Sequence, residues 1–442
     1  MLKKLFKSGF FKSLMVLAGG SLIGTVIIAV CEIARTWIFP ESEVGVFTFL
    51  LAVPLTFISI TALRYDISVV IEEDDRKALA LVKLSGLLTL LISLLVMIGF
   101  MVYILGFKRD YIKYLYVTPL IPLITMGYGV NNLLNAYNNR YKEYGTISKK
   151  YVIRTAVQYI TTIVFGFIFV YLLKLPALSV LIMMVPYALG LYAGVRNQAK
   201  GIIARKEELK SITGAEMWEV AKKHRRQVFF SSPGLFVNSY SFSVITFLIE
   251  DIFGTATVAF YSISNRVLGI PISLVSGNVA KVYIEEASRE YEKTGRFFNA
   301  FKRTLLFLAA MAVPMLLLMY FVAPPVCRII LGEGWEVAGE YIKILSVMFA
   351  FRLIGTALSQ SLAVCNRQGI ELIVNIGLVL ASVLSGILTR AAGGDIYYFL
   401  KSICISRSIC YIGLIATVFI CSLGKKNALN DNADPKEQSI AQ

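Results

Sequence analysis

Apolar residues occur along this chain in long continuous runs that short polar stretches separate. Each run is about 20 residues long, which lets a helix cross a hydrocarbon core roughly 30 Å thick. Within each run, apolar and polar residues do not alternate as they do in the strands of a membrane β-barrel, so the pattern excludes a barrel. The pattern predicts an all-α polytopic membrane protein with about twelve spanning helices. The predicted spans are 13–34, 44–63, 84–106, 114–136, 151–173, 176–195, 228–249, 255–280, 304–323, 342–364, 371–389 and 397–421.

The predicted spans fall into two sets of six on either side of a polar, basic stretch. Residues 44–47 (VGVF) resemble residues 258–261 (VAFY), as duplicated halves would. Repeated halves with a site between them are common in transporters. We therefore predict two six-helix lobes around a central cavity. The predicted divisions are an N-terminal lobe over 1–195, a basic central loop over 196–227, a C-terminal lobe over 228–422 and a disordered tail over 423–442.

Composition and charge agree with this assignment. Hydrophobic residues make up 57% of the 442 residues and charged residues only 16%, and the mean hydropathy is +0.70, which is too apolar for a soluble domain. Most of the 44 Lys and Arg fall on one side of the predicted spans, so the positive-inside rule places both termini in the cytoplasm. This distribution accounts for the net charge of +16 without nucleic-acid binding.

The chain lacks the residue patterns of several enzyme classes. Its six cysteines have no metal-ligand spacing, and His224 is the only histidine, so neither a zinc site nor a histidine-based triad is expected. No GxxxxGK[ST] phosphate-binding loop is present, and the external loops are short. We expect a protein that is not an enzyme and has no cofactor, with a proton or sodium gradient or the membrane potential as its energy source.

Three arginines lie near the middle of predicted spans: Arg266, Arg352 and Arg407. A guanidinium at mid-bilayer costs about 2.5–3.5 kcal/mol on insertion scales and usually faces a bundle interior or a water-filled path. Mid-span carboxylates are nearly absent, so the three cations lack obvious protein partners. An anionic substrate would satisfy them, and guanidinium suits phosphate oxygens. The alternative is that each arginine donates hydrogen bonds to backbone carbonyls of neighbouring spans.

Several amides are candidate sugar contacts. Asn131 and Asn135 share one face of the fourth span at i, i+4 spacing, and Gln360 lies in the tenth span. Such a face either lines a cavity or joins helices by hydrogen bonds.

Charged residues also mark the ends of the first two spans. Glu32 and Arg35 are three residues apart and can pair with each other; alternatively, Glu32 is a protonatable coupling carboxylate and Arg35 contacts substrate at the exit. Arg64 and Asp66 lie at the inner end of the second span. They are either interface anchors or a substrate contact and a second ion-coupling group.

Several stretches resemble one transporter family. In the first half these are Arg35, Pro40-Glu41, 45–47 and 63–67 (LRYDI). In the second half they are 222–233 (KKHRRQVFFSSP), 261–266 (YSISNR) with Pro271, Val282-Tyr283, 286–289 (EASR) and 331–341. In this order they resemble the bacterial O-antigen and capsule repeat-unit flippases. This polysaccharide transporter family belongs to the superfamily that also holds multidrug extruders and the peptidoglycan-precursor flippase.

The resemblance implies a two-lobed exporter in the bacterial cytoplasmic (inner) membrane. Its substrate would be an undecaprenyl-diphosphate-linked oligosaccharide, with membrane lipid, a polysaccharide polymerase and a chain-length regulator as partners. Arg266, Arg352 and Arg407 would hold the diphosphate, with Arg64 at the entrance. Two alternatives remain open: a cation-coupled drug antiporter of the same superfamily, and a polysaccharide polymerase or ligase.

Overall fold

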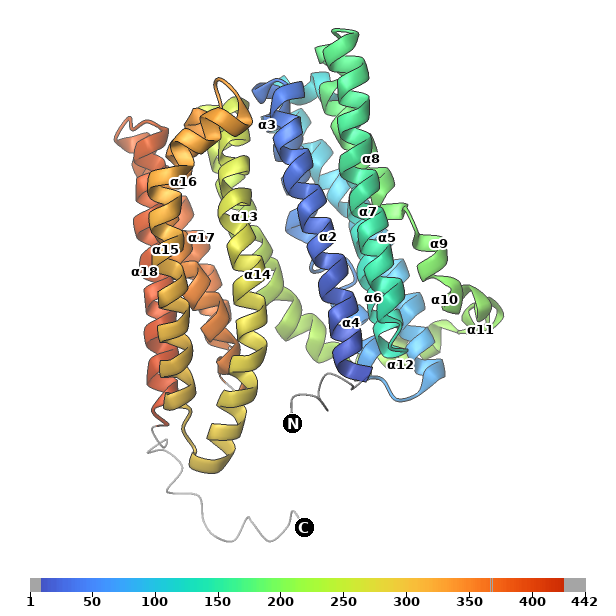
Figure 1. Ribbon diagram of the computed structural model, residues 1–442. Coiled ribbons are helices and arrows are strands. Elements are labelled where there is room, and N and C mark those ends of the chain that lie inside the picture. The colour runs from blue at the N-terminus through green and yellow to red at the C-terminus, as the bar shows by residue number, and fades with distance from the viewer. Residues whose placement is uncertain (1–8, 366, 368, 425–442) are drawn as a thin grey trace.

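The computed structural model describes residues 9–365, 367 and 369–424. Two bundles of long helices stand side by side, and short helices join them at the lower end of Figure 1, where α2 begins and α18 ends. The first bundle contains α2 (Gly9–Ile38), α3 (Glu41–Phe57), α4 (Tyr65–Ile71), α5 (Asp75–Phe107), η1 (Arg109–Val117), α6 (Leu120–Arg140), α7 (Tyr144–Phe165), η2 (Gly166–Leu172), η3 (Pro176–Leu178) and α8 (Ser179–Tyr192).

The second bundle contains α13 (Ser232–Phe253), α14 (Thr255–Thr294), α15 (Phe298–Leu331), α16 (Glu336–Leu358), η5 (Ser359–Ala363), α17 (Gly369–Ala391) and α18 (Ile396–Ser422). Ten of the described helical segments are long and apolar enough to cross a membrane. The shorter α3 and the asparagine-rich α6 lie among these ten helices. Together they make twelve helices, the number of the predicted spans. The predicted two-lobed helical fold is confirmed.

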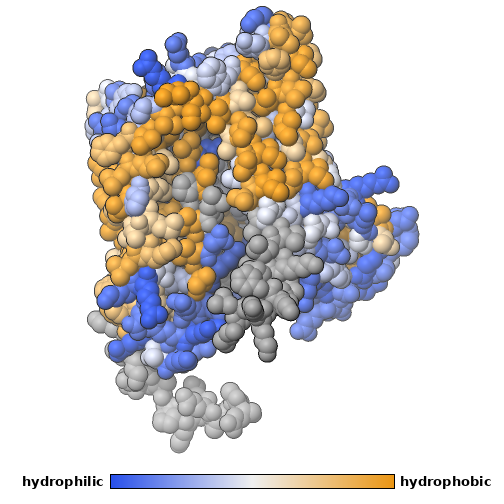
Figure 2. Space-filling model, in the orientation of Figure 1, coloured by the Kyte–Doolittle hydropathy of each residue, from blue (hydrophilic) through white to orange (hydrophobic). Residues whose placement is uncertain are grey.

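Apolar side chains face outward on both bundles. Figure 2 shows them in a broad zone across the middle and upper right of the molecule, with hydrophilic residues at the lower end and along the upper edge. Leu95, Ile98, Leu317 and Phe321 are examples of large exposed apolar side chains on α5 and α15. A surface of this kind is stable only against lipid, so the chain is a multi-pass membrane protein.

The central stretch is helical and packs under the first bundle. It consists of α9 (Val195–Gln198), α10 (Lys200–Ala204), α11 (Lys206–Ser211), α12 (Gly214–Lys223) and η4 (Gln227–Ser231). A capping box of Thr213 and Glu216 begins α12, and ion pairs join Arg76 to Glu216 at 2.6 Å and Lys77 to Glu219 at 2.7 Å. The predicted basic loop is thus a folded element. Of the predicted tail, only residues 423 and 424 are described.

The two bundles touch most closely at the upper end. Gly254, with φ of +86°, makes the sharp turn from α13 to α14, a conformation that a side chain would oppose. A Cβ at Gly45 of α3 would overlap the carbonyl oxygen of Thr255 at the start of α14. Residues 44–47 and 258–261, whose sequences resemble each other, therefore lie next to a direct contact between the lobes.

Candidate functional site

A cavity of about 680 Å³ lies between the two bundles. Helices α2, α3 and α7 line it from the first bundle, and α13 and α14 from the second. Hydroxyl groups and aromatic rings dominate its wall, and Arg266 is the one charged residue among the described residues that line it. The lining includes Ser21, Thr25, Phe47, Thr48, Tyr151, Tyr159, Ser239, Phe242, Ser243, Thr246, Tyr261, Ser262 and Asn265.

Arg266 is bound to a carboxylate from the other bundle. Its Nη1 pairs with Glu32 Oε1 and donates a hydrogen bond to the Tyr159 hydroxyl at 3.0 Å. Glu32 Oε2 lies 2.6 Å from Nη2 of Arg35. The predicted Glu32–Arg35 pair is therefore present. The prediction that Arg266 lacks a protein partner is wrong, because the fold brings the Glu32 carboxylate of α2 to the Arg266 guanidinium of α14.

The three side chains differ in their access to the cavity. The side chain of Arg266 is 32% exposed, whereas those of Glu32 and Arg35 are 7% and 6% exposed. Two guanidinium groups share one carboxylate, so the cluster carries one net positive charge. Of the three side chains, only that of Arg266 lines the cavity and presents this positive charge to it.

Arg352 and Arg407 form a second cationic group, one layer behind the cavity wall. The guanidinium carbons lie 4.3 Å and 5.6 Å from the ring centroid of Phe242, which itself lines the cavity. Nε of Arg352, and Nε and Nη2 of Arg407, are buried without a hydrogen-bond partner in the described part of the chain. Of the three mid-span arginines, only Arg266 lines the cavity directly, and the other two lie behind Phe242 of its wall.

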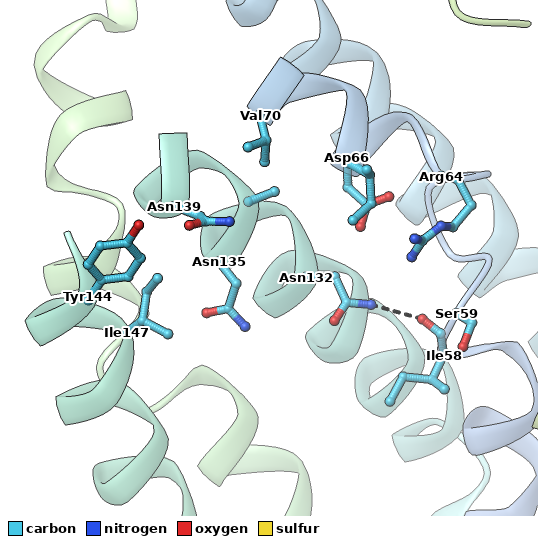
Figure 3. A pocket seen from close by; sticks show the side chains of 12 residues that line it. Ile58, Ser59, Arg64, Asp66, Val70, Asn132, Asn135, Asn139, Tyr144 and Ile147 are labelled. Atoms are coloured by element: carbon cyan, nitrogen blue, oxygen red, sulfur yellow. Dashed lines mark hydrogen bonds between the residues drawn. The ribbon is translucent and has the colours of Figure 1, made fainter. Parts of the chain in front are cut away.

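A second cavity, of about 510 Å³, lies near the lower end of the first bundle. Figure 3 shows Arg64 and Asp66 on one side of it and Asn135 and Asn139 of α6 on the other. Arg64 has φ of 66°, a strained conformation for a residue with a side chain, and its Nε is buried without a partner among the described residues. Burial raises the pKa of Asp66, although Arg64 opposes the shift.

The predicted amide contacts divide into different environments. Nδ2 of Asn131 donates to the carbonyl oxygens of Gly127 and, at 2.9 Å, Leu191, so this side chain joins α6 to α8. Asn135 lines the lower cavity, and its Oδ1 accepts a hydrogen bond from Gln198 at 2.6 Å. Gln360 is exposed in η5 and lines none of the cavities described above.

Lys150 and Arg154 are site residues that the sequence analysis missed. The predicted fifth span begins at residue 151, so it contains Arg154 but not Lys150; α7 already begins at Tyr144, which places Lys150 within the helix too. They line a cavity of about 250 Å³ together with Ser21, Asn131, Asn135, Ile147, Ser148 and Tyr151. The available signal was their i, i+4 spacing, which puts both on one helical face.

Comparison with known proteins identifies the fold. Residues 218–340 match the profile of a family described as "Polysaccharide biosynthesis protein". An inward-facing multidrug resistance MATE transporter is 14% identical with a TM-score of 0.67, covering 94% of this chain and 99% of that chain. The lipid II flippase MurJ is 13% identical with a TM-score of 0.66, and the match covers 92% of this chain and 90% of that chain. This chain has the MATE/MurJ transporter fold.

A third solved structure agrees with the first two. A MOP superfamily transporter from Pyrococcus furiosus is 15% identical with a TM-score of 0.59, and the match covers 94% of this chain and 96% of that chain. No curated protein sequence matches the chain. The resemblance to polysaccharide transporters is thus confirmed by the profile match in the second half and by the fold of nearly the whole chain.

In this MATE/MurJ-like fold, the bundles are joined at the upper end. Nζ of Lys108, directly after α5, lies 2.8 Å from Glu250 and 3.0 Å from Asp251 at the end of α13. The Tyr111 hydroxyl donates to Glu250 at 3.0 Å, and the Trp37 indole donates to the Ile330 carbonyl at 2.8 Å. Within the described residues, every ion pair between the bundles lies at this cluster or at Arg266.

Proposed function

We propose that this chain flips undecaprenyl-diphosphate-linked oligosaccharide repeat units from the inner to the outer leaflet of the bacterial cytoplasmic membrane. The product would feed capsule, O-antigen or exopolysaccharide synthesis. The observation that carries this proposal is a central cavity between two lobes whose one charged lining residue, among those described, is an arginine. A diphosphate is the anion of such a substrate.

The charges around the cavity favour an anion over a cation. The cluster of Glu32, Arg35 and Arg266 has one net positive charge, and Arg352 and Arg407 add two more behind Phe242. Uncompensated cations in a region of low dielectric constant are costly. A diphosphate that accepts paired hydrogen bonds from Arg266 would relieve this cost, and the surrounding hydroxyl groups suit sugars.

The proposed path runs from the lower to the upper end of Figure 1. The lower end, with the termini and the basic central helices, would face the cytoplasm. The diphosphate would pass Arg64 at the entrance, bind Arg266 and leave past Arg35, while the lipid tail stays in the bilayer. Rocking of the two lobes would open the upper end, driven by a proton or sodium gradient or by the membrane potential. No chemical step and no cofactor is required.

A drug or cation antiporter on the same fold is the main competitor. Such a protein needs carboxylates where the cation binds. The described lining of the central cavity contains none, and Glu32 beside it is already shared by two guanidinium groups. The arrangement therefore favours the flippase.

Replacement of Arg266 tests the proposal directly. Arg266→Ala leaves Glu32 paired with Arg35, so we expect normal protein levels in the membrane. Charge-assisted hydrogen bonds contribute about 1.5–3 kcal/mol, so export of surface polysaccharide should fall by roughly 10- to 100-fold. Arg266→Lys should restore part of it. The control is Arg328→Ala, which removes an arginine whose side chain is 71% exposed at the end of α15.

The assay is surface polysaccharide per cell, normalised to the amount of protein in the membrane. Full export by Arg266→Ala would refute the proposed anion site. Loss of export in both the Ala and the control variant would show that the assay reports general damage.

A further inference from the structure

The cavity around Lys150 and Arg154 lies within the first bundle, between the lower cavity and the central one. It has a volume of about 250 Å³, and α2, α6 and α7 line it. Lys150 and Arg154 project from adjacent turns of α7, Ser21 comes from α2, and Asn131 and Asn135 come from α6. The described lining contains two cations, several neutral hydrogen-bonding groups and no carboxylate.

Both cations are only weakly compensated by protein. Lys150 is 4% exposed, and its Nζ donates to the Leu191 carbonyl at 3.2 Å. Nε of Arg154 donates to Gln158 Oε1 at 3.3 Å, and its guanidinium lies 5.1 Å from the Tyr128 ring centroid. Among the described residues, neither cation has a carboxylate within ion-pair distance. A buried ammonium held by a single carbonyl is costly.

The three cavities share lining residues and therefore adjoin one another. Asn135 and Ile147 line both the lower cavity and the Lys150 cavity. Ser21 and Tyr151 line both the Lys150 cavity and the central one. Cationic side chains thus line three neighbouring cavities in succession: Arg64 the lower one, Lys150 and Arg154 the middle one, and Arg266 the central one.

We propose that Lys150 and Arg154 form a second diphosphate-binding site, which holds the lipid-linked substrate before it reaches Arg266. The inference rests on the proposed flippase function and adds a site within one bundle, on the first lobe alone. Two cations one helical turn apart match the two phosphates of a diphosphate, and the Asn135 amide and the Ser21 hydroxyl can donate to the remaining oxygens. A substrate held here can be loaded without movement between the lobes.

Binding to purified full-length protein in nanodiscs of neutral phosphatidylcholine tests this site. The probe is farnesyl diphosphate, a short polyprenyl diphosphate, compared with inorganic pyrophosphate and with nanodiscs that contain phosphatidylglycerol. We expect Lys150→Gln/Arg154→Gln to bind farnesyl diphosphate roughly 10- to 100-fold more weakly than the unmodified protein. The matched control is Lys149→Gln, which removes an exposed lysine from the same helix and should leave binding unchanged.

A stability measurement separates a binding role from a structural one. If the cations exist for the ligand, Lys150→Met removes an undercompensated charge, so the thermal unfolding midpoint of the ligand-free protein should stay equal or rise. Farnesyl diphosphate should then raise that midpoint less than it does in the unmodified protein. A clear fall of the ligand-free midpoint would indicate a structural lysine and overturn the proposal.

The binding outcomes distinguish failure of this site from failure of the proposed function. If the double variant binds farnesyl diphosphate like the unmodified protein while Arg266→Ala binds it more weakly, the second site is wrong and the flippase proposal stands. If only the response to phosphatidylglycerol changes, the site holds a phospholipid headgroup and the diphosphate assignment is overturned. If the unmodified protein binds no farnesyl diphosphate, both proposals fail.

Discussion

At the scale of single residues, Glu32 sets the charge of the central site. It is nearly buried and shared between Arg35 and Arg266, which come from opposite lobes. In the proposed function, a substrate diphosphate would have to compete with this carboxylate for the exposed side of Arg266. Glu32 would then limit how tightly the anion binds and favour its release on the other side of the membrane.

Neutralising Glu32 should strengthen binding and slow transport. In Glu32→Gln the cluster gains one net positive charge, so we expect farnesyl diphosphate to bind at least several-fold more tightly while polysaccharide export falls. Both quantities are measured on the same variant, in nanodiscs and in cells. Weaker binding would contradict this competition. If the pH dependence of export is also unchanged, Glu32 is not the coupling group.

At the scale of elements, α12 is attached to the first lobe by Glu72, just after α4. The side chain of Glu72 is 2% exposed, and it accepts hydrogen bonds from Lys223 at 2.7 Å and His224 at 2.8 Å. Burial alone would raise the pKa of Glu72, but the bonds from Lys223 and His224 outweigh it and lower the pKa to about 2. This carboxylate therefore ties the linker between the lobes to the first lobe.

The attachment of α12 should weaken in acid. The pKa of Glu72 is lowered on folding, so its stabilisation is present above the ordinary value of 4.5 and is lost as the pH falls toward about 2. Hydrogen exchange of residues 214–223, corrected for intrinsic rates, should therefore accelerate over this range. Glu72→Gln should show fast exchange already at pH 7. In the control Glu219→Gln, whose carboxylate is largely exposed, exchange should change little.

Helix ends show where element-scale prediction fails. The predicted fifth span begins at residue 151, which leaves Lys149 and Lys150 in the polar stretch before it. In the structure α7 begins at Tyr144, and Lys150 is buried against α8. Hydropathy reports only the average polarity of a segment. It cannot show that the polar face of a helix lines an internal cavity, so the sequence analysis missed Lys150 and Arg154 as site residues.

At the scale of the whole molecule, the cluster around Lys108 joins the lobes at the upper end. Lys108 bridges Glu250 and Asp251, and Asp251 also pairs with Arg390 of α17. In the proposed transport cycle, alternating access would require these contacts to break whenever the upper end opens. The cluster would then stabilise the arrangement in which the upper end is closed.

Loss of Lys108 should shift the protein toward an open upper end. Lys108→Ala leaves Glu250 buried with Tyr111 alone, and a charge-assisted bond of about 1.5–3 kcal/mol is lost, enough for roughly a tenfold shift in population. Spin labels at exposed positions 110 and 392, in a cysteine-free background, should show longer distances by pulsed electron resonance. Lys113→Ala, at an exposed lysine nearby, is the control. Unchanged distances would show that other contacts hold the lobes together.

The amino-acid pattern alone was enough to predict the spans, the two lobes and the three mid-span arginines. These features are local, because the hydrocarbon core demands an apolar run of set length and makes each intramembrane charge stand out. Only the tertiary structure decided what each charge faces. Glu32 and Arg266 are 234 residues apart, Phe242 separates Arg352 and Arg407 from the cavity, and Lys150 turns inward. These outcomes depend on how distant helices pack, which no local pattern records.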